Sequence, residues 1–120
     1  MSLFSWLLMG HLVGDWLLQN DWMATGKKQA FITRSGLTHF TIYTLVIMLT
    51  LMLTNSSDRD PFRLGLLTII IFISHWIIDA TDIVGRWIRF YKQSDITLIR
   101  IMVDQTFHLI ILAVVVSAIS

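Results

Sequence analysis

The stretch "GHLVGDWLLQND", residues 10–21, decides the fold because it places two ionisable side chains inside an apolar run. His11 and Asp15 lie one helical turn apart among Leu, Val and Trp. An aspartate at the centre of a membrane-spanning helix costs roughly 2.5–3.5 kcal/mol on insertion scales. Either partners inside the protein offset that cost, or the segment does not lie in a membrane.

The composition of the whole chain favours the membrane. The 120 residues are 55% hydrophobic and 14% charged, with a mean hydropathy of +0.70, whereas soluble domains carry about 25% charged residues. Four apolar stretches account for this, at about 3–20, 36–54, 62–87 and 96–119. Each approaches or exceeds the roughly 20 residues needed to cross the hydrocarbon core. We predict an all-α fold, a single integral membrane domain over residues 1–120 with four transmembrane helices in a bundle of two helical hairpins.

Composition also limits the class of function. The chain has no cysteine, so disulfides and thiolate metal sites are excluded. A net charge of +1 gives no reason to propose nucleic acid as a partner. The first apolar run starts at residue 2 without a basic segment before it, so we interpret it as a retained helix rather than a signal peptide.

The distribution of basic residues predicts the orientation. Loops 21–35 and 85–95, together with the start of the last helix, carry Lys27, Lys28, Arg34, Arg86, Arg89, Lys92 and Arg100, against Arg59 and Arg63 on the opposite side. By the positive-inside rule these two loops are cytoplasmic and both termini lie outside. The segment "GRWIRFYK" adds aromatic residues to its cations, which suits anionic lipid head groups. The expected partners are the lipid bilayer and either other membrane-protein subunits or a second copy of the chain.

All four histidines lie within the apolar stretches, and three of them have an aspartate four residues away. The pairs are His11/Asp15, His75/Asp79 and Asp104/His108, while His39 stands in the second stretch. A spacing of four puts both side chains of a pair on one helix face. The His-x-x-x-Asp pattern in the first and third stretches also forms a weak internal repeat.

The predicted depths of these groups match. With a rise of about 1.5 Å per residue, the three aspartates and His39 lie roughly 5–10 Å inside the cytoplasmic boundary, and the other histidines roughly 12–17 Å. They can therefore share one cluster that opens towards the cytoplasm, with His39 at its mouth. Imidazole nitrogen and carboxylate oxygen are ligands of Zn, Mn and Fe. We predict a divalent metal site formed by His11, Asp15, His39, His75, Asp79, Asp104 and His108.

Two other interpretations of the cluster stay open. A proton-sharing His–Asp network can hold the helices together without metal, and histidines in a bundle can ligate a macrocycle. Nearby polar residues have simpler predicted roles: Arg86 and Arg100 can pair with Asp82 and Asp104 at a spacing of four. Lys27 and Lys28 are interpreted most simply as orientation signals, with contact to lipid head groups as the lesser alternative.

Four segments carry a family resemblance: "GHLVGDWLLQNDWMA", "LTHFTIY", "SHWIIDATD" and "DQTFH". In these the chain resembles a widespread bacterial family of small integral membrane proteins, domain-of-unknown-function family 3307. The resemblance implies a bacterial inner or internal membrane and makes the His/Asp pairs features of the family, but it supplies no activity. The intramembrane His and Asp residues are also similar to those of membrane-bound metal-dependent hydrolases.

Three classes of function fit these predictions. The chain can be a metal-dependent hydrolase of a lipid-linked or membrane-proximal substrate, which uses metal-activated water. It can be an ion or proton translocator, since His/Asp chains are typical relay material. It can also be a non-catalytic small subunit of a larger membrane complex. Metal binding is predicted ahead of any of these activities.

Overall fold

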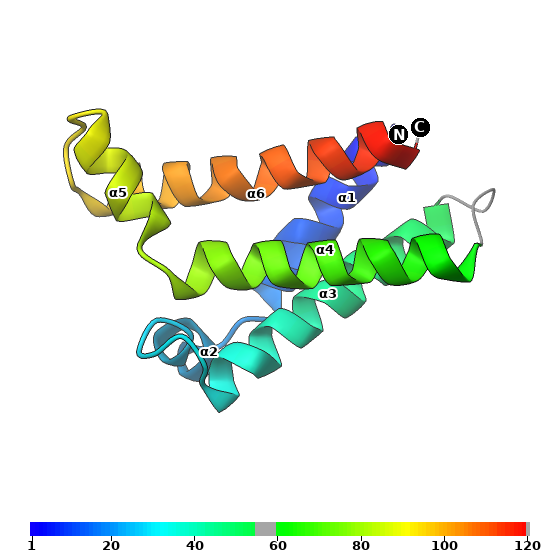
Figure 1. The fold of residues 1–120 in the computed structure, drawn as a ribbon, viewed down its shortest axis with the longest axis horizontal. Helices are drawn as coiled ribbons and strands as arrows, with labels where there is room; N and C mark the ends of the chain where they lie inside the picture. The colour runs from blue at the N-terminus through cyan, green and yellow to red at the C-terminus, as the bar shows by residue number, and fades with distance from the viewer. Residues whose placement is uncertain (55–59, 120) are drawn as a thin grey trace.

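The computed structural model describes residues 1–54 and 60–119, whose regular structure is all helical, as predicted. Figure 1 shows the elements in chain order, which are α1 (Leu3–Leu12), the π-helical turn η1 (Val13–Leu17), α2 (Asp21–Gly26), α3 (Arg34–Thr54), α4 (Pro61–Ala80), α5 (Ile83–Phe90) and α6 (Thr97–Ile119). Both termini lie at one end of the molecule, and the short helices α2 and α5 lie at the other (Figure 1).

Among the described residues, three helices are long and apolar enough to cross a membrane: α3, α4 and α6. The ten residues of α1 and the five of η1 form a shorter helical stretch. At 1.5 Å per residue this stretch is about 22 Å long, less than the roughly 30 Å of the hydrocarbon core. Three candidate spans are therefore established, and the fourth span and the two-hairpin arrangement remain predictions.

Two predicted helices end earlier than expected. The first stops at Leu17 instead of residue 20, because the side chain of Asn20 accepts a hydrogen bond from the Met23 N–H and thereby starts α2. The stretch predicted as one helix over 62–87 is broken after Ala80, where Thr81 is extended and its hydroxyl donates to the Ile77 carbonyl. The segment after the break forms the separate helix α5. Arg59, predicted on the outer side, lies outside the described residues.

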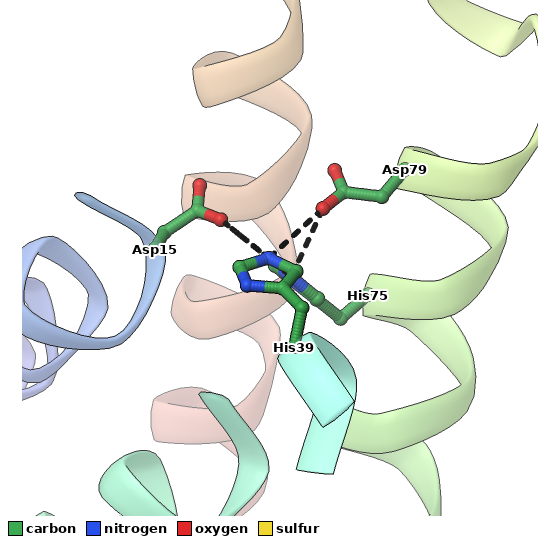
Figure 2. Close-up of side chains that lie close together, drawn as sticks. All are labelled: Asp15, His39, His75 and Asp79. Atoms are coloured by element: carbon green, nitrogen blue, oxygen red, sulfur yellow. Dashed lines mark hydrogen bonds and ion pairs between the residues drawn. The ribbon is translucent and has the colours of Figure 1, made fainter. Parts of the chain in front are cut away.

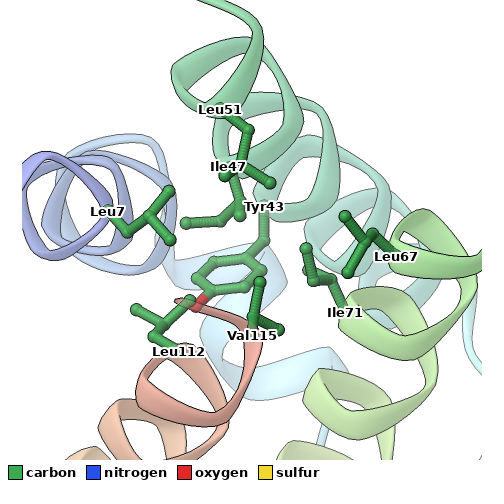
Figure 3. Close-up of a cluster of buried hydrophobic side chains, with 8 residues drawn as sticks. All are labelled: Leu7, Tyr43, Ile47, Leu51, Leu67, Ile71, Leu112 and Val115. Carbon is green, nitrogen blue, oxygen red and sulfur yellow. The ribbon is translucent and has the colours of Figure 1, made fainter. Parts of the chain in front are cut away.

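An apolar core fills the end of the bundle that carries the termini. Figure 3 shows its eight buried side chains, contributed by α1, α3, α4 and α6: Leu7, Tyr43, Ile47, Leu51, Leu67, Ile71, Leu112 and Val115. The first helical stretch approaches α3 closely, since a Cβ added at Gly14 would lie 3.1 Å from the Tyr43 ring. The Gly10-x-x-x-Gly14 spacing thus serves helix packing, as such spacings do in membranes.

The connection between α2 and α3 folds back against α4. The indole of Trp76 stacks on Phe31 with ring centroids 4.9 Å apart, and its N–H donates to the Phe31 carbonyl at 2.7 Å. The Thr33 hydroxyl donates to the Gly26 carbonyl at 2.8 Å. These contacts hold the end of α2, and with it Lys27, beside the bundle.

We expect Gly26→Ala to destabilise this arrangement, because the new Cβ would lie 2.6 Å from the Cβ of the buried Ser35. Overpacking of this kind costs about 1–3 kcal/mol, which a lowered midpoint of thermal unfolding in detergent will report. Gly65→Ala is the matched control, since a Cβ there meets nothing within 4 Å and alanine favours a helix. Adding Ser35→Gly to Gly26→Ala should restore part of the loss. Equal midpoints for the two single variants would contradict the close contact.

Candidate metal centre

Four buried side chains from three elements converge at the centre of the molecule (Figure 2). They are Asp15 on η1, His39 on α3, and His75 and Asp79 on α4, and each is at most 3% exposed. The Nε2 atom of His39 lies 3.1 Å from Asp15 Oδ1 and 3.2 Å from Asp79 Oδ2. The Nε2 atom of His75 lies 2.9 Å from that of His39 and 3.1 Å from Asp79 Oδ2. We call these four residues the inner group.

The spacing of the inner group matches a metal coordination shell. Bonds of about 2.0–2.1 Å to a tetrahedral zinc ion place its ligand atoms about 3.3 Å apart. The separations given above lie between 2.9 and 3.2 Å, and His75 Nε2 lies 3.6 Å from Asp15 Oδ1. These five separations differ from the tetrahedral value by a few tenths of an ångström, and all four ligand atoms lie within 4.8 Å of one another.

Helix α6 adds His108 and Asp104 beside the inner group. The Nδ1–H of His108 donates to the Asp104 carbonyl at 2.8 Å, so in the neutral ring Nε2 carries the lone pair. This Nε2 lies 3.4 Å from Asp79 Oδ1, and neither atom has a hydrogen-bond partner within the described ranges. A backbone carbonyl behind the imidazole is the usual support of a metal-ligating histidine. Asp15, Asp104 and His108 themselves form a second group with ligand atoms within 4.8 Å of one another.

His11, which the sequence placed among the ligands, belongs to neither group. Gln105 donates its two amide N–H groups to carboxylates, at 3.2 Å to Asp15 Oδ2 and 3.1 Å to Asp104 Oδ2. Its Oε1 therefore accepts from His11 Nε2–H at 2.6 Å. The remaining ring nitrogen of His11 then accepts from the Tyr43 hydroxyl at 2.9 Å. This chain runs in one direction, from the tyrosine to the two carboxylates, and makes His11 a support of the site.

The π-helical turn explains why the first His/Asp pair departs from the predicted geometry. The wider turn starts at Val13, between His11 and Asp15, so the two side chains no longer share a face. In the regular helix α4 the Nε2 of His75 and the Oδ2 of Asp79 are 3.1 Å apart, as the spacing predicts. Turns of the π type occur frequently at functional sites.

His39 was expected at the mouth of the cluster, and this placement is wrong. Its side chain is 0% exposed and contacts His75 and both carboxylates of the inner group. The α2–α3 connection, part of the predicted loop 21–35, packs against Trp76 of α4 through Phe31. His39 therefore lies at the centre of the cluster.

Lys27 is the site residue that sequence reasoning missed. Its side chain is buried, and Nζ lies 2.7 Å from Asp79 Oδ2. In the sequence it stands in a polar, basic loop, where nothing distinguishes it from Lys28. Three carboxylates, of Asp15, Asp79 and Asp104, and one ammonium leave two negative charges in this region when the histidines are neutral. One divalent cation cancels them.

Near the helix ends, Asp82 and Arg100 form ion pairs with residues other than those predicted. Asp82 pairs with Arg89 at 3.0 Å rather than with Arg86. Arg100 makes two contacts with Asp95, at 2.5 and 3.0 Å, instead of pairing with Asp104. The Arg89 and Arg100 guanidinium groups hold the pKa values of Asp82 and Asp95, respectively, below the usual range. Asp104 is thereby left to face the cluster.

A cleft of about 770 Å³, lined in part by Ala24 of α2 and Val84 of α5, leads to the cluster. The carboxylates of Asp15, Asp79 and Asp104 line it, together with Lys27 and Gln105. The cluster is therefore open to solvent on this side.

Comparisons with known proteins give the family. A family model described as "protein of unknown function (DUF3307)" matches residues 3–120. The chain therefore belongs to this family, which confirms the resemblance seen in the sequence. No curated protein and no solved structure matches the chain.

We expect Gln105→Leu to destabilise the chelator-treated protein by about 1–3 kcal/mol, because the His11 N–H, Asp15 Oδ2 and Asp104 Oδ2 each lose their hydrogen bond to Gln105. Gln19→Leu is the matched control, since the Gln19 side-chain oxygen is buried with no partner in the described part of the chain. Unfolding in detergent, followed by circular dichroism, measures both. A control that loses as much stability as Gln105→Leu would show that the network contributes nothing specific.

Proposed function

We propose that this member of the DUF3307 family is an integral membrane protein that binds one divalent metal ion, Zn, Mn or Fe, through the inner group and uses it to hydrolyse a membrane-proximal substrate. The observation that carries the proposal is the convergence of four buried ligand atoms at the separations of a coordination shell. Two imidazoles and two carboxylates are the ligand types these metals share.

Charge balance supports the metal. Lys27 pairs with Asp79, so the carboxylates of Asp15, Asp79 and Asp104 together with this ammonium carry two negative charges, which one divalent ion neutralises. Burying carboxylates without such compensation is costly, and they would take up protons instead. A divalent ion thus makes the charge of this region zero with all histidines neutral, which is their ligating form.

The cleft supports hydrolysis over a purely structural ion. A divalent ion supplies a nucleophilic water at neutral pH by lowering its pKa. The side chain of Asp104 is 20% exposed and lines the cleft beside the inner group, so its carboxylate can accept the proton of that water. Asp79, which also lines the cleft, is fixed by Lys27 and the histidines.

One observation disfavours the translocator. The polar network runs from the cleft to Tyr43 and ends there, where the apolar core begins. A translocator needs polar groups that continue to the opposite surface, and the core residues between Tyr43 and the termini are aliphatic. The site therefore faces one side only.

In the membrane arrangement that we propose, α1 and η1 form the fourth span, both termini lie outside and the basic loops are cytoplasmic. The two ends of the chain lie at the same end of the molecule, which this arrangement requires (Figure 1). Cysteine replaces Ser2 in one variant and the exposed Gln29 in another, in a chain with no other cysteine. An impermeant thiol reagent added to intact cells should label position 2 and not position 29. The opposite pattern would reverse the topology.

For the metal, we expect elemental analysis of the purified chain to find one divalent ion per molecule, which Asp79→Asn should abolish. Asp95→Asn is the control, because Asp95 pairs with Arg100 at the surface. A chelator should lower the unfolding midpoint of the wild type, since an ion that binds only the folded state stabilises it. A wild-type chain purified without stoichiometric metal at neutral pH, and insensitive to added Zn, Mn and Fe, would overturn the proposal.

A further inference from the structure

We infer that the cleft beside the inner group binds a lipid with a phosphate head group, with the phosphate directed at Lys27 and the metal position. This inference rests on the proposed function, because the ion supplies part of the positive charge. It adds the chemical class of the substrate, which neither the family nor the metal site specifies.

The cleft is amphiphilic, as a lipid ligand requires. Its polar floor carries the carboxylates and Lys27, whereas Trp16, Ile78, Val84 and Ile101 contribute apolar surface. Trp16 is 57% exposed, so its ring is available to a ligand. A volume of about 770 Å³ lies in the range of small-molecule sites, which is about 300–1,000 Å³. It holds a head group and the first part of the chains, and the remainder of each chain stays in the bilayer.

The charge of the lining favours an anion only when metal is present. Four carboxylates, of Asp15, Asp79, Asp82 and Asp104, face three cations, of Lys27, Lys28 and Arg100, so the lining alone carries one negative charge. A divalent ion in the inner group reverses the sign. Anionic ligands are therefore repelled from the empty site and attracted to the loaded one.

Lys27 is placed to hold the phosphate. Its ammonium has three N–H donors, and the contact with Asp79 Oδ2 at 2.7 Å uses one of them. Its side chain is 8% exposed, so the charge is poorly hydrated and its attraction for an anion is less screened than at the surface. A lysine beside a metal is a common phosphate-binding arrangement, with the ammonium acting as a point charge. The exposed Lys28 adds a second cation where a ligand would enter.

The test uses the full chain, loaded with zinc in a non-ionic detergent, and isothermal titration calorimetry with three probes. Dihexanoyl phosphatidic acid should bind with saturation. Inorganic phosphate, which lacks the acyl chains, should bind at least about tenfold more weakly than phosphatidic acid. Dihexanoyl phosphatidylcholine, which has no net charge, should also bind at least about tenfold more weakly. Treatment with a chelator should abolish binding of phosphatidic acid.

Variants then separate the lipid site from the metal site. Lys27→Met should weaken the binding of phosphatidic acid at least about tenfold. Zinc should stay bound, since removing a nearby cation favours metal binding. Lys28→Met should weaken lipid binding severalfold. Because Lys28 is at the surface, this variant keeps the test available if Lys27→Met does not fold. Lys92→Met is the control, because Lys92 is basic, exposed and outside the cleft lining, and it should leave both affinities unchanged.

Each outcome decides between the two proposals. The lipid site is overturned, and the metal site is retained, if the chain binds one zinc ion but shows no saturable binding of phosphatidic acid. The same conclusion follows if both lysine variants bind the lipid as tightly as the wild type. Equal affinities for inorganic phosphate and phosphatidic acid reduce the ligand to a free phosphate and also overturn it. Absence of zinc from the wild type overturns the proposed function, and the lipid site with it.

Discussion

The carboxylate of Asp79 is the group around which the rest of the structure is organised. It is 2% exposed in an apolar bundle, and its oxygens lie within 3.4 Å of His39, His75, His108 and Lys27. A buried charge without partners is so costly that it would unfold the chain or take up a proton. The helices that carry these partners must therefore pack at positions where their polar groups meet this one side chain.

This requirement explains the irregular parts of the fold. The π-helical turn places Asp15 against His39, while His11 turns to Tyr43 and Gln105. The α2–α3 connection folds back against Trp76, which positions Lys27. At the end with the termini, the buried core side chains other than Tyr43 are aliphatic and come from regular helices (Figure 3). The irregular backbone occurs beside the polar cluster.

The same arrangement gives the site a direction. Its polar network opens into a cleft on one side and ends against the aliphatic core on the other. A divalent ion in the inner group would neutralise the buried carboxylates and turn the cleft from repelling anions to attracting them. Folding, the proposed metal binding and the proposed choice of ligand are in this way linked by the same charge balance.

The sequence by itself determined the helical class, the apolar segments and six His and Asp residues of the cluster, those of the two candidate groups. The length of the apolar segments indicates the helices, because about 20 apolar residues are needed to cross a membrane. The occurrence of every histidine within these segments indicates the cluster, because ionisable groups there need partners. The i, i+4 rule was sufficient for His75 and Asp79, which share a regular helix. It failed for His11, since the π-helical turn that separates it from Asp15 has no signature in the residues alone.

Only the tertiary structure decided which of these residues touch. It placed His39 at the centre of the cluster instead of its mouth, left His11 outside both candidate groups with hydrogen bonds to Tyr43 and Gln105, and brought in Lys27 from a loop. Each of these placements depends on contacts between segments far apart in the chain, such as Trp76 with Phe31 and Gln105 with Asp15. Periodicity describes a residue relative to its own helix. The position of a side chain relative to another helix follows from packing, which depends on all the residues at the contact.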